Sequence, residues 1–207
     1  LLSRRQRQMC IRDSFLASAF CSGPAILLLL LMAVRRVTGF EPGREAMKTL
    51  STIITYAMCV NVFFYLLEIF TAFYSGIPGH QHSILYLFTG HDGHMAWINS
   101  WMWTAVVFAV LSLLMLIPPA LRYNDKILPW ALILLVIASW IDKSLGLLIG
   151  GFVPNMFETV TEYTPTIPEI LVALGVYGLG GIIISVLWKI AMDVNCLLYT
   201  SPSPRDA

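Results

Sequence analysis

An aspartate and a lysine stand side by side in a stretch that is otherwise apolar. Asp142 and Lys143 fall within residues 128–150, a run long enough to cross a bilayer. By insertion scales, each ionisable group costs about 3 kcal/mol at the centre of a membrane helix, so such groups usually face a bundle interior or a wet cavity. The pair therefore indicates proton or ion chemistry, with a neutralised structural pair as the alternative.

A further carboxylate lies in a different apolar stretch. Asn61, Tyr65 and Glu68 are spaced i, i+4 and i+7, which places them on one stripe of a helix. We expect this stripe to face neighbouring helices rather than lipid. Since consecutive helical residues point about 100° apart, we expect Asp142 and Lys143 to have separate partners, with Glu68 as the partner of Lys143.

The composition is that of an integral membrane protein. Of the 207 residues, 57% are hydrophobic and 12% are charged, and the mean hydropathy is +0.75, whereas a soluble domain has about 25% charged residues. The sequence predicts an all-α, polytopic membrane bundle with five transmembrane helices, at about residues 15–34, 49–74, 97–118, 128–150 and 167–192. The basic residues form no patch that could follow phosphates, so we expect no nucleic-acid partner.

Both ends of the chain differ in character from the rest. Residues 1–14 and 194–207 resemble translated sequencing-adapter sequence, and we expect neither segment to be genuine. The membrane bundle then comprises residues 15–193. We further expect it to be a fragment of a larger protein that continues beyond both ends.

The loops between the predicted spans differ in charge. Apart from Lys143, the Lys and Arg residues between the adapter-like ends all fall on one side of the membrane: Arg35, Arg36, Arg44, Lys48, Arg122, Lys126 and Lys189. By the positive-inside rule this side is cytoplasmic, so we expect a multi-pass protein of a bacterial or archaeal cytoplasmic membrane. Glu68, Asp142 and Lys143 then lie at similar depth in the outer half, where they can meet.

The histidines lie in an outer loop, residues 75–96. A zinc site from His80-x-His82 and His91-x-x-His94 has compatible spacing, but we favour a solvated loop and expect no metal in this chain. Because no histidine lies in a predicted span, we expect no haem b ligated across helices, and there is no CxxCH motif for haem c.

The sequence contains no arrangement typical of nucleophilic catalysis. No phosphate-binding glycine loop is present either, so we assign no catalytic residue. Thr166 and Glu169 have the spacing of a capping box, which predicts the start of the last helix. Buried acids and a lysine remain, and these suit proton uptake or release beside a quinone head group, or ion transport.

Several segments follow one another in a characteristic order. They read NVFFYLLEIFTAFYS at 61–75, IPGH at 77–80, WIDK at 140–143, GGFVP at 150–154 and EYTPTIPE at 162–169. In this order they resemble the C-terminal half of the NrfD-like family of polysulfide-reductase-type membrane subunits. The resemblance is closest to the ten-span variety of DsrP and of hydrogenase cytochrome-b-like subunits, and it covers about residues 15–193.

The resemblance implies a quinone- or quinol-interacting membrane subunit of a respiratory oxidoreductase complex, rather than a stand-alone enzyme. Such a subunit binds no haem, takes menaquinone or ubiquinone as substrate, and exchanges electrons with an outward-facing iron–sulfur partner. Further complex subunits and membrane lipid surround it. The partner is expected on the outer loops, which carry His80, His91, Glu158, Glu162 and Glu169.

In the family, the better-supported quinone site lies in the N-terminal bundle, which we expect to be missing from this chain. Glu68, Asp142 and Lys143 are therefore predicted as a proton or charge cluster, with Asn61 and Tyr65 as a supporting polar stripe. One alternative is a secondary transporter or an ion or proton channel, for which we would expect interrupted helices and inverted repeats. The sequence reveals neither. The other alternative is an inert membrane anchor.

Overall fold

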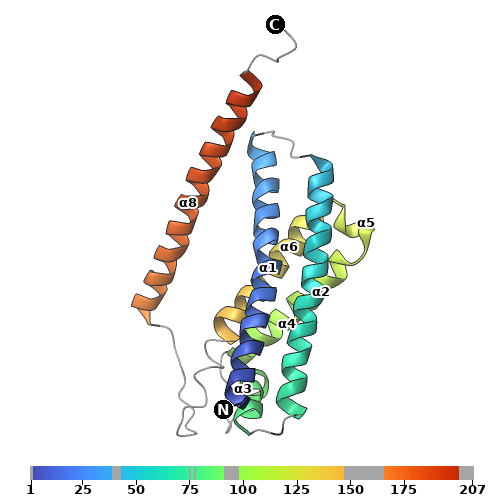
Figure 1. Ribbon diagram of the computed structural model, residues 1–207, viewed down its shortest axis with the longest axis vertical. Helices are drawn as coiled ribbons and strands as arrows, with labels where there is room; N and C mark the ends of the chain where they lie inside the picture. Colours follow the sequence, from blue (N-terminus) through green and yellow to red (C-terminus); the bar gives the residue numbers. More distant parts are fainter. Residues whose placement is uncertain are drawn as a thin grey trace. The chain divides into compact units, whose positions relative to one another are not determined.

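The computed structural model describes the backbone of residues 2–38, 43–74, 76, 78–90, 98–146 and 166–200. It describes their side chains except for residues 2–12, 37–38, 78–80, 82–83, 192 and 194–200. Within these ranges every regular element is a helix, which confirms the all-α prediction (Figure 1). The elements are α1 (Leu2–Thr38), α2 (Arg44–Tyr74), α3 (Pro78–Thr89), α4 (Ile98–Leu116), α5 (Pro119–Arg122), α6 (Leu128–Trp140), the π-helical segment η1 (Ile141–Gly146) and α8 (Ile167–Thr200).

Five helical stretches are long and apolar enough to cross a membrane. They are Asp13–Arg36, Arg44–Tyr74, Ile98–Leu116, Leu128–Gly146 and Ile167–Ala191, which agree with the five predicted spans to within a few residues. A helix satisfies its own backbone hydrogen bonds, so it is the structure that such an apolar run adopts in lipid. The chain is therefore a multi-pass membrane protein.

The chain divides into two units, residues 1–162 and residues 163–207. In the first unit α4 packs chiefly against α6 and α1 against α2, and α6 also contacts α1 (Figure 1). The second unit contains α8. At its start, the Thr166 backbone N–H donates to Glu169 Oε2 at 2.9 Å, as the predicted capping box requires.

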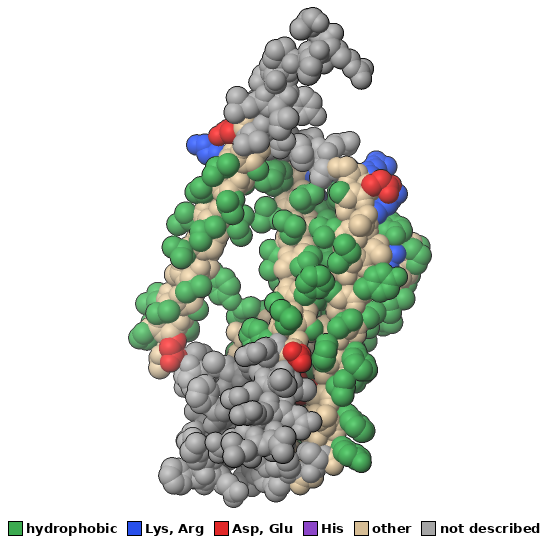
Figure 2. All heavy atoms as spheres, in the orientation of Figure 1, with side chains coloured by type: hydrophobic (Ala, Val, Ile, Leu, Met, Phe, Trp, Pro, Cys, Tyr) green, Lys and Arg blue, Asp and Glu red, His purple; other side chains and the backbone are tan. Residues whose placement is uncertain are grey.

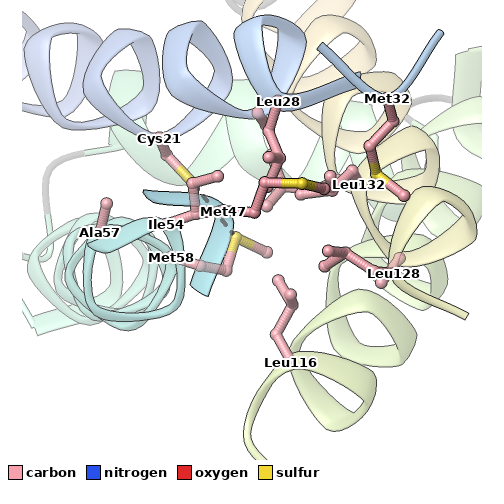
Figure 3. Packing of buried hydrophobic residues seen from close by; sticks show 13 residues of the cluster. Cys21, Leu28, Met32, Met47, Ile54, Ala57, Met58, Leu116, Leu128 and Leu132 are labelled. Carbon is pink, nitrogen blue, oxygen red and sulfur yellow. Dashed lines mark hydrogen bonds between the residues drawn. The ribbon is translucent and has the colours of Figure 1, made fainter. Parts of the chain in front are cut away.

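We call the end of the first unit that carries Arg35, Lys48 and Arg122 the basic end. Arg35 Nη1 lies 3.0 Å from Asp125 Oδ2 there, which joins the end of α1 to the connection between α5 and α6. The main core cluster lies in the half of the unit nearer this end, and Figure 3 shows the packing of its side chains. Its fully buried members include Leu28, Ile54, Met58, Leu132 and Leu135.

Close packing, rather than removal of apolar surface from water, holds this core together. Lipid tails are as apolar as leucine, so membrane helices associate through van der Waals contact and hydrogen bonds. Small side chains such as Ala25, Ala57 and Ala131 occupy the core and allow close approach of the helices. Between α4 and α6, Ser112 Oγ donates to the Ala131 carbonyl oxygen at 2.9 Å.

Large apolar side chains cover the outside of the first unit. Figure 2 shows them along the helices, with Lys, Arg and acidic groups gathered where α2 begins. On α2, Phe63, Leu66 and Phe70 are each about 60% exposed. An apolar surface of this kind faces lipid or neighbouring membrane helices, so polar groups that carry out chemistry belong to the interior.

We expect Leu132→Ala to lower the free energy of unfolding by about 1–3 kcal/mol. The substitution leaves a cavity inside the bundle, and the side chains around it lose van der Waals contacts that lipid cannot replace. Leu132 is fully buried, whereas Leu66 is 59% exposed on the lipid-facing surface. Leu66→Ala is the matched control and should change stability by less than about 0.5 kcal/mol. Unfolding in mixed micelles measures both variants, and equal effects would contradict the assigned core.

The prediction for the segment between the second and third spans is wrong. Residues 75–96 were expected to form a loop, but Pro78–Thr89 within them form α3. Tyr86 and Leu87 of this helix are buried in a second apolar cluster with Ile98, Met102, Ala105 and Ile141. An isolated helix of twelve residues is marginal, so packing against α4 and η1 stabilises a segment whose turn-forming neighbours are typical of a loop.

Candidate functional site

The Asp142–Lys143 pair lies in η1, the π-helical continuation of α6. Lys143 Nζ lies 3.1 Å from Asp142 Oδ2 and donates to Ser14 Oγ at 2.8 Å. The Lys143 side chain is 13% exposed and the Asp142 side chain is 23% exposed. The pair is thus shielded within the bundle rather than turned toward lipid.

The expectation that Asp142 and Lys143 have separate partners is wrong. Lys143 pairs with its own neighbour, and among the described side chains it forms no ion pair with Glu68. A π-helix closes its hydrogen bonds over five residues and winds more loosely than an α-helix, so the 100° separation of an α-helix does not apply. The flexible stem of Lys143 covers the remaining distance.

A pocket of about 60 Å³ nevertheless brings the three predicted groups together. Glu68 and Tyr65 line it from α2, while Asp142 and Lys143 line it from η1. The remaining lining residues are Ile69, Ile84, Leu87, Phe88, Met102 and Gly146. Asn61, the other member of the predicted stripe, is half-buried but does not line the pocket.

Gly146 keeps the pocket open beside the charged pair. A Cβ atom at this position would lie 3.1 Å from Met102 Cε and 3.7 Å from Asp142 Oδ1. The first distance is shorter than ordinary van der Waals contact, so a larger residue would displace Met102 or fill space next to the carboxylate. A Cβ atom here would therefore require the end of the Met102 side chain to shift by a few tenths of an ångström.

Two polar groups at the pocket have no protein partner among the described residues. The Tyr65 hydroxyl is buried without a hydrogen bond, and the Glu68 carboxyl group has neither a hydrogen bond nor an ion pair in that part of the chain. Buried polar groups are normally hydrogen-bonded, and polar cavities of this size hold a few water molecules. Organic ligands occupy pockets of roughly 300 Å³ or more. The pocket therefore suits water and a proton rather than an organic ligand.

The numbers of acidic and basic groups at the pocket determine whether it can bind a proton. It contains two carboxyl groups and one ammonium group, from Glu68, Asp142 and Lys143. The ammonium group neutralises one carboxylate, so the set is neutral when it holds one additional proton. Net charge is costly at this depth, and a site of this kind can accept and release a proton. We refer to these three residues as the charge cluster.

The structure adds residues that the sequence analysis did not assign to the site. Ser14, which accepts the hydrogen bond from Lys143, was placed in the adapter-like segment 1–14. It is buried, as are Ser18 and Cys21, and the i, i+4, i+7 spacing of these three residues would have indicated that they share one inward-facing stripe. The pocket-lining residues of α3 were missed because that segment was assigned to a loop.

The structure describes only some of the residues that were predicted to contact a partner protein. His91, Glu158 and Glu162 lie outside the described residues, and of His80 only the backbone, within α3, is described. The side chains of the four possible zinc ligands, His80, His82, His91 and His94, are likewise not described. Neither the predicted partner contacts of these residues nor a zinc site is therefore tested. Glu169 is described, and its carboxylate caps the start of α8.

Comparison with known proteins gives one informative match. No family model matches the chain. A Halobacterium salinarum protein, provisionally named as a membrane subunit of dimethyl sulfoxide reductase, is 26% identical over 198 residues. The match covers 82% of this chain and 42% of that protein, so the chain spans less than half the length of this relative. The chain is thus a multi-pass membrane protein similar to a reductase membrane subunit.

Proposed function

We propose that the chain is part of a quinone- or quinol-interacting membrane subunit of a respiratory oxidoreductase complex. The similarity to a protein named as a reductase membrane subunit supports this class, as do the five membrane-crossing helices and the NrfD-like order of the sequence segments. Menaquinone or ubiquinone is the proposed substrate. In this proposal the chain holds no haem and no metal, and the electrons pass to or from a separate protein.

The charge cluster carries the proposal for this chain's own role. Oxidation of a quinol releases two electrons and two protons, and the protons require acceptors within the protein. Glu68 stands beside the Asp142–Lys143 ion pair at a water-sized pocket, in a bundle that otherwise presents apolar side chains to lipid. We assign to the cluster the uptake and release of a proton during quinone turnover.

The position of the cluster favours proton exchange on one side of the membrane. The apolar core around Leu28, Ile54 and Leu132 lies between the cluster and the basic end. Because the positive-inside rule makes the basic end cytoplasmic, the proton would exchange with the outer side. The same side is the proposed docking face for an iron–sulfur partner, on loops that carry acids and histidines.

One observation favours the alternative of a secondary transporter or channel. The fourth span changes from α- to π-helix at Ile141–Gly146 without a break, a local irregularity that the sequence did not reveal. Transporters often place ion sites at irregular membrane helices. An inert anchor is less favoured, because burying ionisable groups has a free-energy cost that a purely structural role does not require.

The test is purification of the full-length protein from its native membrane. We expect an iron–sulfur protein to copurify, and we expect the preparation to oxidise a quinol or reduce a quinone in a reaction that a quinone analogue inhibits. Reconstituted protein that moves ions without quinone, and that copurifies with no iron–sulfur protein, would contradict the proposal and support a transporter.

A further inference from the structure

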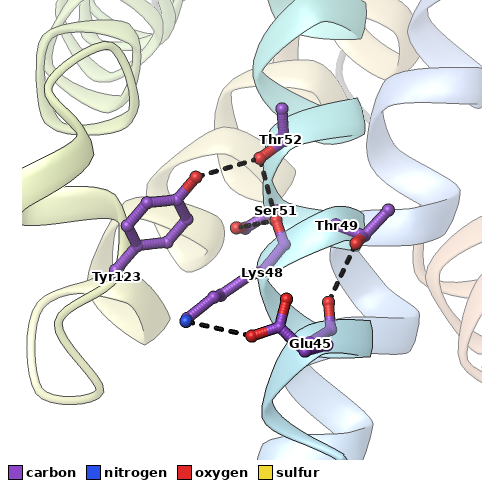
Figure 4. Close-up of polar contacts among 6 residues, drawn as sticks. All are labelled: Glu45, Lys48, Thr49, Ser51, Thr52 and Tyr123. Carbon is purple, nitrogen blue, oxygen red and sulfur yellow. Dashed lines mark hydrogen bonds and ion pairs between the residues drawn. The ribbon is translucent and has the colours of Figure 1, made fainter.

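Two basic side chains lie close to one tyrosine ring at the basic end. Arg122 Cζ lies 4.8 Å and Lys48 Nζ 6.0 Å from the centre of the Tyr123 ring, distances at which a cation interacts favourably with an aromatic face. Figure 4 shows the Lys48 side chain reaching from α2 toward this ring, and the Tyr123 hydroxyl beside Thr52, 3.4 Å from its Oγ1. The arrangement places two positive charges within about 6 Å of the centre of a single aromatic ring.

Among the described residues Arg122 forms no ion pair, in contrast to Arg35 and Lys48. Arg35 pairs with Asp125 at 3.0 Å and Lys48 with Glu45 at 3.2 Å. By contrast, the hydrogen bond described for the Arg122 side chain goes from Nη2 to the Tyr123 hydroxyl, at 2.9 Å. A guanidinium group has five N–H donors, and here Nε is buried without an acceptor. Among the described residues, Arg122 therefore has no ion-pair partner, and its Nε–H has no hydrogen-bond acceptor.

The local charge is positive even after the neighbouring acid is counted. Glu45 balances Lys48, but its side chain is 88% exposed, so water weakens its contribution. The hydrogen bond with Thr52, the hydrogen bond from Arg122 and the nearby cations together lower the pKa of the Tyr123 hydroxyl. The two hydrogen bonds are the larger causes of the lowered pKa, and the charges of Arg122 and Lys48 add to them.

The depth of this group indicates which anion can reach it. Arg122 and Tyr123 lie between the ends of α4 and α6, and Lys48 lies near the start of α2, so all three stand where membrane spans leave the hydrocarbon. Tyrosine, arginine and lysine at this level contact lipid head groups. The phosphate of a phospholipid is held there at high local concentration, whereas a free phosphate ion is not.

We propose that Arg122 and Lys48, both beside the Tyr123 ring, bind the phosphate of an anionic phospholipid at the basic end. Arginine and lysine both donate charge-assisted hydrogen bonds to phosphate oxygens. A head group such as glycerol adds no positive charge, so a phosphatidylglycerol matches the excess charge of the site. A choline head group would bring a second cation close to Arg122 and Lys48 and is therefore disfavoured.

Native mass spectrometry of the full-length protein tests this site. Protein in detergent is given equal amounts of phosphatidylglycerol and phosphatidylcholine with the same acyl chains. The wild type should retain phosphatidylglycerol in preference. Since a direct hydrogen bond between charged groups contributes on the order of tenfold, Arg122→Gln with Lys48→Gln should reduce the preference by more than about tenfold.

The matched control is Arg36→Gln with Lys126→Gln, which removes the same charge from exposed residues of the same end. We expect this control to keep most of the preference. An equal loss in both double variants would show a general field effect rather than a site and would overturn the proposal. Displacement of the lipid by millimolar inorganic phosphate would also overturn it, because the site would then take a free anion.

Discussion

Replacing Lys143 with methionine is expected to destabilise the folded bundle by about 3–5 kcal/mol. Methionine has a similar length but no charge, so Asp142 would remain in the bundle without the ammonium group that lies 3.1 Å away. Ser14 would also lose its hydrogen bond from Nζ. The measurement is the yield of folded protein, followed by unfolding of whatever assembles.

Two further variants separate loss of the pair from loss of any lysine. Lys143→Met combined with Asp142→Asn removes both charges and should recover most of the stability, because no uncompensated charge stays buried. Lys48→Met is the matched control. Lys48 is half-exposed and pairs with Glu45 on the same helix, so its loss should cost less than about 1 kcal/mol. Equal costs for the two lysine variants would contradict a buried ion pair.

Replacing Glu68 with glutamine is expected to slow quinol oxidation by about 100-fold, the lower limit of what a positioned acid–base group contributes. Glutamine has nearly the same shape but cannot take up or release the proton. Asp142 and Lys143 would still form their ion pair. Steady-state quinol oxidation by the complex that contains the full-length protein measures the effect.

The control for this substitution is Glu45→Gln. Glu45 lies on the same helix as Glu68 but is 88% exposed at the basic end, so we expect no more than a twofold change in rate, on the order of what surface charges contribute. Both variants must assemble to wild-type levels before their rates are compared. A Glu68→Gln enzyme with the wild-type rate would exclude Glu68 from the proton route.

The membrane fold was predictable because its signal is the strongest in a sequence. Apolar runs of about 20 residues determine the spans with little help from tertiary contacts. The meeting of Glu68 with Asp142 and Lys143 also followed, since charge in the loops indicates the direction of each span and direction gives depth. The structure places the three residues at one pocket.

Local geometry was less predictable, because it depends on packing between segments distant in the sequence. The π-helical turn at Ile141–Gly146 accompanies the close approach of Gly146 to Met102, and nothing in the residues of that turn distinguishes it from a continued α-helix. Similarly, α3 is stabilised by contacts with α4 and η1. The periodicity of apolar residues along the sequence cannot predict contacts of this kind between distant segments.

Proton release per quinol oxidised tests the central claim most directly. The complex is sealed into vesicles with a pH indicator on the side opposite the basic end, and release is followed after addition of quinol. We predict prompt release by the wild type, and slower or incomplete release by assembled Glu68→Gln and Lys143→Met variants. Unchanged rate and yield of proton release in both variants would contradict a role for the charge cluster.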